Sequence, residues 1–145
     1  MRLSFALAAV LLTTALPAWP QTPTDDTNSK LLNRFGTEIK GRENEPAGQV
    51  FRNVQYLKDV NAATPLAIMD IGYSRALGVS CTYCHAEQDF ATDEKRPKRA
   101  AREMHVMHRS FNDQLRKMVN GETPADARSI NCTTCHCGRA IPSVR

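Results

Sequence analysis

The chain has 145 residues, with 19 basic and 15 acidic side chains and a formal net charge of +4. This mild excess does not predict nucleic acid as a partner, and one small domain is the expected organisation. Five phenylalanines, three tyrosines and one tryptophan are few large aromatic residues for such a domain. Side-chain burial alone would stabilise it only marginally, so a staple or a cofactor is expected to complete its core.

Residues 1–18 have the layout of a secretory signal peptide. Arg2 supplies a positive charge, residues 3–16 form an apolar run, and Pro17 and Ala18 close it. The run is too short to span a bilayer convincingly, and no second hydrophobic segment follows it. We therefore expect export, with cleavage after Ala18 and a periplasmic location for the mature chain.

Residues 19–45 form a polar N-terminal arm. They include the run TPTDD at 22–26 and show little periodicity. This composition predicts a mobile tail or an arm that lies on the surface. Residues 46–145 are then expected to form the folded domain.

Two helices are predicted in the first half of this domain. Residues 50–60 carry apolar side chains at helical spacing, although an extended conformation also fits. Residues 65–77 form the second predicted helix, with Pro65 at its first position and Gly78 just past its end.

A third helix is predicted for residues 97–119, ending before Asn120 and Gly121. His108 lies on its apolar face, and His105 lies about a quarter turn away. The apolar stripe consists of Met104, Met107, Phe111, Leu115 and Met118. No stretch alternates strongly enough to predict a sheet. We therefore predict a mainly α fold of helices and loops with little or no sheet.

Two copies of the motif Cys-x-x-Cys-His occur, at residues 81–85 and 132–136. Two thiols at this spacing can add to the two vinyl groups of one haem, and the histidine that follows becomes the proximal iron ligand. A zinc site, disulfides or redox dithiols are the alternatives. Export favours haem, because thioether attachment is completed outside the cytoplasm. The motifs predict two covalent haem c groups, held by Cys81, Cys84 and His85 and by Cys132, Cys135 and His136. Each motif is expected to start a short helix that ends near its histidine.

The methionines are candidate sixth ligands, because a thioether sulfur opposite a histidine raises the reduction potential of a haem iron. Met69 lies on the predicted helix before the first motif and could fold back over the first haem. Periodicity does not choose among the candidates for the second haem, which are Met104, His105, Met107, His108 and Met118.

Five basic residues lie between the motifs, at Lys95, Arg96, Lys98, Arg99 and Arg102. They could form a solvated helix face, pair with haem propionates, or steer an acidic redox partner. Cys137, the fifth cysteine, could be a buried thiol, form an intermolecular disulfide, or compete with Cys135 for haem.

Residues 46–142 resemble one half of the photosynthetic reaction-centre cytochrome c subunit, a tetrahaem family built from two dihaem halves. The matching stretches are VFRNVQYLK at 50–58, IMDI at 68–71, ALGVS at 76–80, AREM at 101–104, FN at 111–112 and both haem motifs. The resemblance implies that the helix before each motif supplies the sixth ligand. It therefore implies Met69 opposite His85 and Met104 opposite His136.

The resemblance also implies a dihaem electron carrier rather than an enzyme. Its expected partners are redox proteins in the periplasm or at the membrane surface, and association with a membrane electron-transfer complex is compatible with it. The alternative function is a haem enzyme, or a sensor of gas or peroxide, in which one iron has an open or displaceable sixth site.

Overall fold

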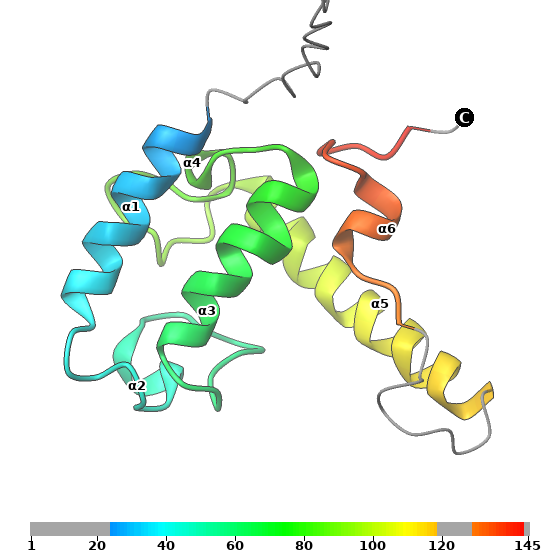
Figure 1. Cartoon of the computed structure of the whole chain (residues 1–145), viewed down its shortest axis with the longest axis horizontal. Helices are drawn as coiled ribbons and strands as arrows, with labels where there is room; N and C mark the ends of the chain where they lie inside the picture. Colours follow the sequence, from blue (N-terminus) through cyan, green and yellow to red (C-terminus); the bar gives the residue numbers. More distant parts are fainter. Residues whose placement is uncertain (1–23, 119–128, 144–145) are drawn as a thin grey trace, which may run out of the picture.

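The computed structural model describes residues 24–118 and 129–143 (Figure 1). Its elements are α1 (Thr24–Glu38), α2 (Ala47–Val50), α3 (Ala63–Ala67), η1 (Ile68–Arg75), α4 (Cys81–Cys84), α5 (Arg96–Met118) and α6 (Cys132–His136). One isolated bridge, between Pro46 and Asn61, is the only β pairing recorded in these residues. The predicted mainly α fold is therefore confirmed.

The helix α1 occupies most of the segment for which a tail or surface arm was expected. The residues Asn28, Leu31, Leu32, Phe35 and Ile39 recur at spacings of three and four, which places them on one face of a helix. Ile39, just past the helix, is 3 % exposed. Residues 24–38 therefore form a regular helix and not a mobile tail, because a short apolar stripe lies within a polar composition. The proposed signal peptide, residues 1–18, lies outside the described residues.

The predicted helix at residues 50–60 is also wrong, because only the end of α2 overlaps it. The helix stops at Phe51, whose backbone is extended, and Asn53 has a φ of 62°. A non-glycine residue in this left-handed region cannot continue a helix. Residues 51–60 instead form turns that return to α2, where the N–H groups of Ala47 and Gly48 donate to the carbonyls of Val60 and Lys58.

The predicted helix at residues 65–77 is confirmed as the continuous pair α3 and η1. The segment η1 has π-helical geometry, which spacing did not predict and which often occurs at functional sites. The helix ends in a Schellman motif, in which the N–H of Gly78 donates to Arg75 and that of Val79 donates to Ser74. Gly78 has a φ of 66°, so it has the left-handed conformation expected of a residue that terminates a helix.

The predicted third helix is confirmed as α5, and both motifs form the expected short helices α4 and α6. In Figure 1, α1 and the α3–η1 helix stand side by side, and α5 extends away from them towards the side where α6 lies. No helix among the residues described combines the length and the hydropathy that a membrane span requires.

The interior of the described part contains small residues where a domain of this kind usually has large ones. Its buried hydrophobic residues are Ile39, Ala47, Ala62, Ala76 and Ala86, and no large side chain is fully buried. The leucines, phenylalanines and valines are half-exposed instead, because many of them surround a cavity.

Candidate haem sites

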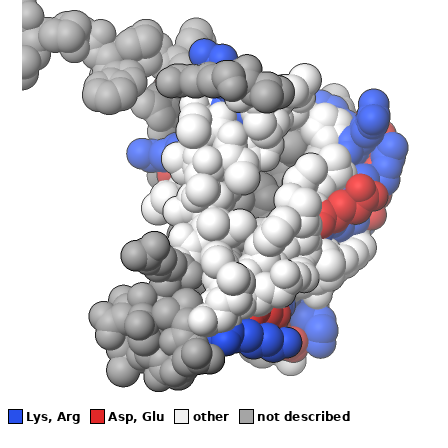
Figure 2. Space-filling view, turned by 90° about the vertical axis from the view of Figure 1, so that its right-hand side faces the viewer, with Lys and Arg blue, Asp and Glu red and all other residues white. Residues whose placement is uncertain are grey.

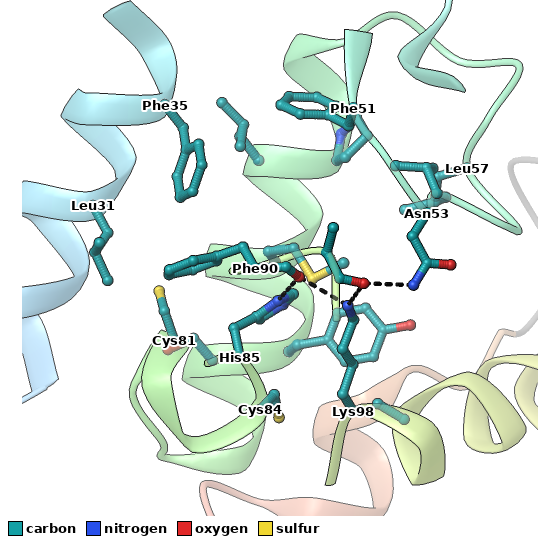
Figure 3. A pocket seen from close by; sticks show the side chains of 18 of the residues that line it. Leu31, Phe35, Phe51, Asn53, Leu57, Cys81, Cys84, His85, Phe90 and Lys98 are labelled. Atoms are coloured by element: carbon teal, nitrogen blue, oxygen red, sulfur yellow. Dashed lines mark hydrogen bonds between the residues drawn. The ribbon is translucent and has the colours of Figure 1, made fainter. Parts of the chain in front are cut away.

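A cavity of about 410 Å³ lies between α1, the loop after α2, η1, α4 and α5 (Figure 3). Its walls are mainly apolar and include Leu31, Leu32, Phe35, Val50, Phe51, Val54, Leu57, Pro65, Leu66, Leu77 and Val79. Cys81, Cys84 and His85 of the first motif line it, and so does Met69. The structure therefore brings all four residues predicted for the first haem to one apolar cavity.

Asn28 holds the first motif against α1 and η1. Its side-chain oxygen accepts a hydrogen bond from the backbone N–H of Cys81 at 2.9 Å, and its amide donates to Ser74 Oγ at 2.6 Å. Ser74 Oγ in turn donates to the carbonyl of Val79. Asn28 and Ser74 are 5 % and 6 % exposed, so these bonds compete little with water. This buried network fixes the start of α4, and sequence spacing gave no signal for it.

The ring of His85 is oriented for metal binding. Its Nδ1 lies 2.8 Å from the carbonyl oxygen of Phe90, and because a carbonyl only accepts, Nδ1 carries the proton. Nε2 is then left with a lone pair, the arrangement common among metal-binding histidines. Burial lowers the pKa of His85, and the nearby cations Lys98, Arg102 and Lys95 lower it further, which favours the neutral imidazole.

Aromatic side chains cover the His85 ring. The Phe90 ring stacks on it with centroids 4.9 Å apart and an interplanar angle of 17°. Phe35 of α1 packs edge-on against Phe90 at 4.9 Å, and the Arg34 guanidinium lies 4.5 Å from the centre of the Phe35 ring. Residues of α1, which the sequence reading left out of the site, therefore restrict the access of water to this imidazole.

Most of the basic run between the motifs is bonded to the chain itself. Lys95 Nζ donates to the carbonyl of Thr82 at 2.5 Å, and Arg99 donates to the carbonyls of Asp93 and Glu94. Arg102 pairs with the Asp93 carboxylate at 2.5 Å and donates to the carbonyl of Asn53. The side chains of Lys95 and Arg102 are only partly exposed, so the solvated-face interpretation is wrong for them, whereas Arg99 is exposed. These bonds also occupy donors that a docking patch would need.

Lys98 is the most deeply placed cation of the run, at 8 % exposed. Its Nζ donates to the carbonyls of Phe90, Ala91 and Thr92 at 2.8, 2.9 and 2.8 Å, and it lies 3.3 Å from an oxygen of Asp93. Lys98 thus binds three consecutive carbonyls with one ammonium group and stabilises the loop that orients His85.

The second motif repeats the histidine geometry of the first. The side chain of Asn131 accepts from the N–H of Thr134 at 3.1 Å, and Thr134 Oγ1 accepts from the N–H of Asn131, which forms a capping box for α6. His136 Nδ1 lies 2.9 Å from the carbonyl of Arg139, so its Nε2 is also left with a lone pair.

The segment that enters α6 is bonded to α5 through Asn112, which is 8 % exposed. The Asn112 side chain bonds both the N–H and the carbonyl of Ile130, at 2.9 and 3.0 Å. His108 Nε2 also bonds this carbonyl, at 2.7 Å. His108 therefore has a structural role in this arrangement. His105 lines the first cavity instead, with Nδ1 3.1 Å from the hydroxyl of Tyr73.

The remaining candidates for the second haem, Met104, Met107 and Met118, are 48 %, 45 % and 76 % exposed. Ile71 of η1 and Phe111 of α5 are also well exposed. Figure 2 views the molecule from the side of α6 and the end of α5, and most side chains seen there carry no charge. In the second motif, Cys135 is exposed and both Cys132 and His136 are half-exposed. The structure does not choose between the methionines of α5.

The structure contains no disulfide bond among the five cysteines, all of which lie in the described residues. Burial raises the pKa of Cys81, Cys84 and Cys132. Cys137 is exposed, and its thiol donates to the carbonyl of Thr133 at 3.3 Å, so the buried-thiol hypothesis is wrong. Among the residues described, no group of three or more His, Cys, Asp or Glu side chains is arranged to hold a metal ion.

The two motifs meet at η1 and the residues that follow it. The N–H of Gly138 donates to the carbonyl of Ala76 at 2.9 Å. Burial raises the pKa of Tyr73 to about 12, with smaller contributions from Cys132 and Cys84, one cysteine of each motif. Tyr73 is therefore close to both attachment segments.

Comparison with known proteins decides the class. The family model described as "Photosynthetic reaction centre cytochrome C subunit" matches residues 20–144. The chain belongs to this family. The resemblance drawn from the sequence is confirmed, and with it a c-type cytochrome whose cofactor is covalently bound haem c.

Curated relatives agree with the family match. Cytochrome c-554 of Chloroflexus aurantiacus is 36 % identical over 124 residues, which cover 81 % of this chain and 28 % of the relative. The reaction center cytochrome c subunits of Rubrivivax gelatinosus and Thermochromatium tepidum are 33 % and 30 % identical over 93 and 99 residues. These alignments cover 58 % and 66 % of this chain, but 25 % and 22 % of those relatives. The chain thus spans about a quarter of their length. The family consists of electron carriers rather than enzymes, as expected.

The first site fits a haem on structural grounds. The cavity is apolar, its two cysteines are free thiols, and its imidazole has a lone pair on Nε2. The half-exposed leucines and phenylalanines around it would bury their surface against an apolar group. Such a group would supply the large apolar core that this domain otherwise lacks.

Proposed function

We propose that this chain is an exported dihaem c-type cytochrome that transfers single electrons between redox proteins in the periplasm or at a membrane surface. His85 and Met69 would bind the iron of the first haem, and His136 and Met104 that of the second. The observation that carries this proposal is the shared cavity of Met69, His85 and the thiols of Cys81 and Cys84.

Two haems, rather than one, are supported by the likeness of the two motifs. In each, a short helix carries both cysteines, and the histidine donates its Nδ1 proton to a backbone carbonyl five or three residues further on. A buried asparagine also ties each segment to a helix outside the motif: Asn28 holds Cys81, and Asn112 holds Ile130.

The chain's own residues account for the electron-carrier function. When bound, haem c supplies a one-electron couple between ferric and ferrous iron. Phe90 stacks on the proximal imidazole, Phe35 packs against Phe90, and Phe90 O holds the proton on Nδ1. Fixed ligands and low water access reduce the movement of ligands and water that occurs when the iron gains or loses an electron. This is what a carrier needs, and no substrate pocket is required.

The proposal is tested by intact-mass measurement of protein exported from a host that attaches haem c. We expect a mass with two haem additions and without residues 1–18. Replacing Cys132 and Cys135 together by serine should remove one addition. The matched control is Cys137→Ser, which should retain both. An apoprotein mass, a zinc adduct, or a single haem in the native chain would contradict the proposal.

Absorption spectra then separate the carrier from a haem enzyme or sensor. Six-coordinate low-spin spectra for both haems in both oxidation states support the carrier. A five-coordinate haem, or one that binds carbon monoxide readily in the unaltered protein, would favour the enzyme or sensor.

A further inference from the structure

The carbonyl oxygen of Phe90 accepts two hydrogen bonds of different kinds. One comes from Nδ1 of His85 at 2.8 Å and the other from the ammonium group of Lys98, also at 2.8 Å (Figure 3). A carbonyl oxygen has two lone pairs, so both donors can be accommodated. A cation and the proximal imidazole therefore share one acceptor.

Burying the charged side chain of Lys98 costs free energy unless partners compensate its charge. At 8 % exposed, it has lost most of its hydration, and lysine is rarely found so buried without partners. Its partners are three carbonyls and the Asp93 carboxylate, and Asp93 is also bonded to Arg102. With two cations and one carboxylate, these three side chains have a formal charge of +1. Asp89, the other carboxylate that acts on Lys98, is paired with Arg52 at 2.8 Å, so the larger group also keeps a formal charge of +1 beside the cavity.

We propose that Lys98 raises the reduction potential of the first haem by acting through Phe90 and His85, an inference that rests on the proposed function. Donation from Nδ1 to a carbonyl increases the electron density of the imidazole and so its strength as a ligand for ferric iron. The ammonium group draws density from the same carbonyl and weakens that effect. Its charge also disfavours the ferric state directly, because ferric iron is the more positive form. Both effects have the same sign.

The second motif provides an internal comparison. His136 Nδ1 donates to Arg139 O at 2.9 Å, and within the described part of the chain no cation is recorded on this carbonyl. The two proximal histidines thus have the same geometry but different electrostatics. Lys98 is a positioning residue for the first haem, so its effect on the potential of the second haem should be clearly smaller.

The test is a spectroelectrochemical titration of the two-haem protein and its Lys98→Met variant. Methionine keeps much of the side chain's length but removes the charge and the donors. We expect the equilibrium constant for reduction of the first haem to fall about tenfold. For one electron this corresponds to a potential lower by about 59 mV. The titration step of the first haem is identified by the variant Met69→His. The chemical shift of the His85 Nδ1 proton in the reduced protein should change as well.

Three further variants make the result specific. Lys98→Arg keeps the charge and should retain a potential close to the original. Lys95→Met removes a charge that is bonded to Thr82 O and not to Phe90 O, and should have a clearly smaller effect. Asp93→Asn removes the anionic partner of Lys98 and Arg102, and should raise the potential; this variant also tests the proposal if Lys98→Met does not fold.

The outcomes separate this inference from the proposed function. Loss of the two-haem mass in the unaltered protein would overturn the proposed function. With both haems attached, the inference is overturned if Lys98→Met leaves the first potential unchanged. It is also overturned if Lys95→Met shifts that potential equally, if Lys98→Arg shifts it as far as Lys98→Met, or if Asp93→Asn lowers it.

Discussion

The carbonyl oxygen of Gly138 occupies the space that a side chain at Gly78 would need: a β-carbon at Gly78 would lie 2.2 Å from it. Gly78 lies three residues before Cys81, the first residue of the first haem motif, and Gly138 lies two residues after His136, the last residue of the second. The backbone contact between these glycines therefore sets how closely the two attachment segments approach.

A series of three glycine-to-alanine variants tests this contact. Gly78→Ala combines a left-handed φ of 66° with overlap against backbone, so we expect it to lower the free energy of unfolding by about 3 kcal/mol or more. Gly138→Ala has a φ of 79° but open space, and should cost about 1–2 kcal/mol. Gly36→Ala in α1 should gain up to about 1 kcal/mol. Denaturant unfolding of the haem-loaded protein, followed by circular dichroism, measures all three. Equal losses for Gly78 and Gly138 would show that strain, and not the contact, requires glycine.

The second prediction concerns Asn28, which joins α1 to the first motif. Asn28→Ala leaves the N–H of Cys81 and the hydroxyl of Ser74 without this partner, so we expect a loss of about 1–3 kcal/mol in the free energy of unfolding. Asn33→Ala, on the exposed face of the same helix, is the matched control and should change stability by less than about 0.5 kcal/mol. If both variants unfold at the same denaturant concentration, the buried network does not stabilise the fold.

The sequence predicted the parts of the fold that depend on strong local signals. Gly78 marked the end of the second helix, and the long stripe of α5 was visible from its spacing. The helix α1 was missed because its apolar residues are few and surrounded by polar ones. The predicted helix after Val50 failed because Asn53 adopts a left-handed conformation. Its side chain donates hydrogen bonds to Ala91 O and Asp93 Oδ1, and residue spacing does not reveal such tertiary contacts.

The candidate site was predictable only where it is encoded in a motif. The six motif residues have characteristic spacing, whereas Lys98 and Asn28 act through backbone groups that any residue possesses. No pattern in the sequence reveals which backbone carbonyls will accept hydrogen bonds from a lysine. The basic run was therefore open to three interpretations, and the structure supplied a fourth, in which the cations hold the loop that orients His85.

The third prediction is a pH dependence that arises at Asp93. Hydrogen bonds from Arg102, then from Asn53 and Lys98, hold the pKa of this carboxyl well below its usual range. A lowered pKa means that the folded state favours the ionised form. The stability it contributes is therefore complete above about pH 4 and is lost as the pH falls further.

Denaturant unfolding between pH 7 and pH 3 measures this effect. The unaltered protein should lose more stability at the acidic end than Asp93→Asn, whose amide does not titrate. Since Asp93 is partly exposed, the difference should be modest. Arg102→Gln should flatten the acidic limb in the same direction. Parallel curves for the unaltered protein and Asp93→Asn would show that this carboxyl contributes nothing to acid sensitivity.

The fourth prediction concerns Met69. Replacing it by histidine should lower the potential of the first haem, because imidazole favours ferric iron more than a thioether does. Axial ligands set haem potentials over a range of about 0.8 V, so we expect a decrease of at least about 59 mV, a tenfold change in equilibrium constant. Met69→Leu keeps an apolar side chain without a ligand, and should make the first haem bind carbon monoxide. A redox titration in which Met69→His leaves both potentials unchanged would exclude Met69 as a ligand.

The last prediction distinguishes the methionines of α5. The structure leaves Met104 and Met107 almost equally exposed, at 48 % and 45 %, so exposure does not identify the ligand of the second haem. The family pattern Ala-Arg-Glu-Met implies Met104. We therefore expect Met104→Ala to remove the weak far-red absorption of methionine-bound ferric haem from the second site, and to lower its potential. Met107→Ala, on the same helix, should change packing and leave both the absorption and the potential in place. The opposite result, with the band lost in Met107→Ala and retained in Met104→Ala, would move the ligand by one helical turn and correct the assignment.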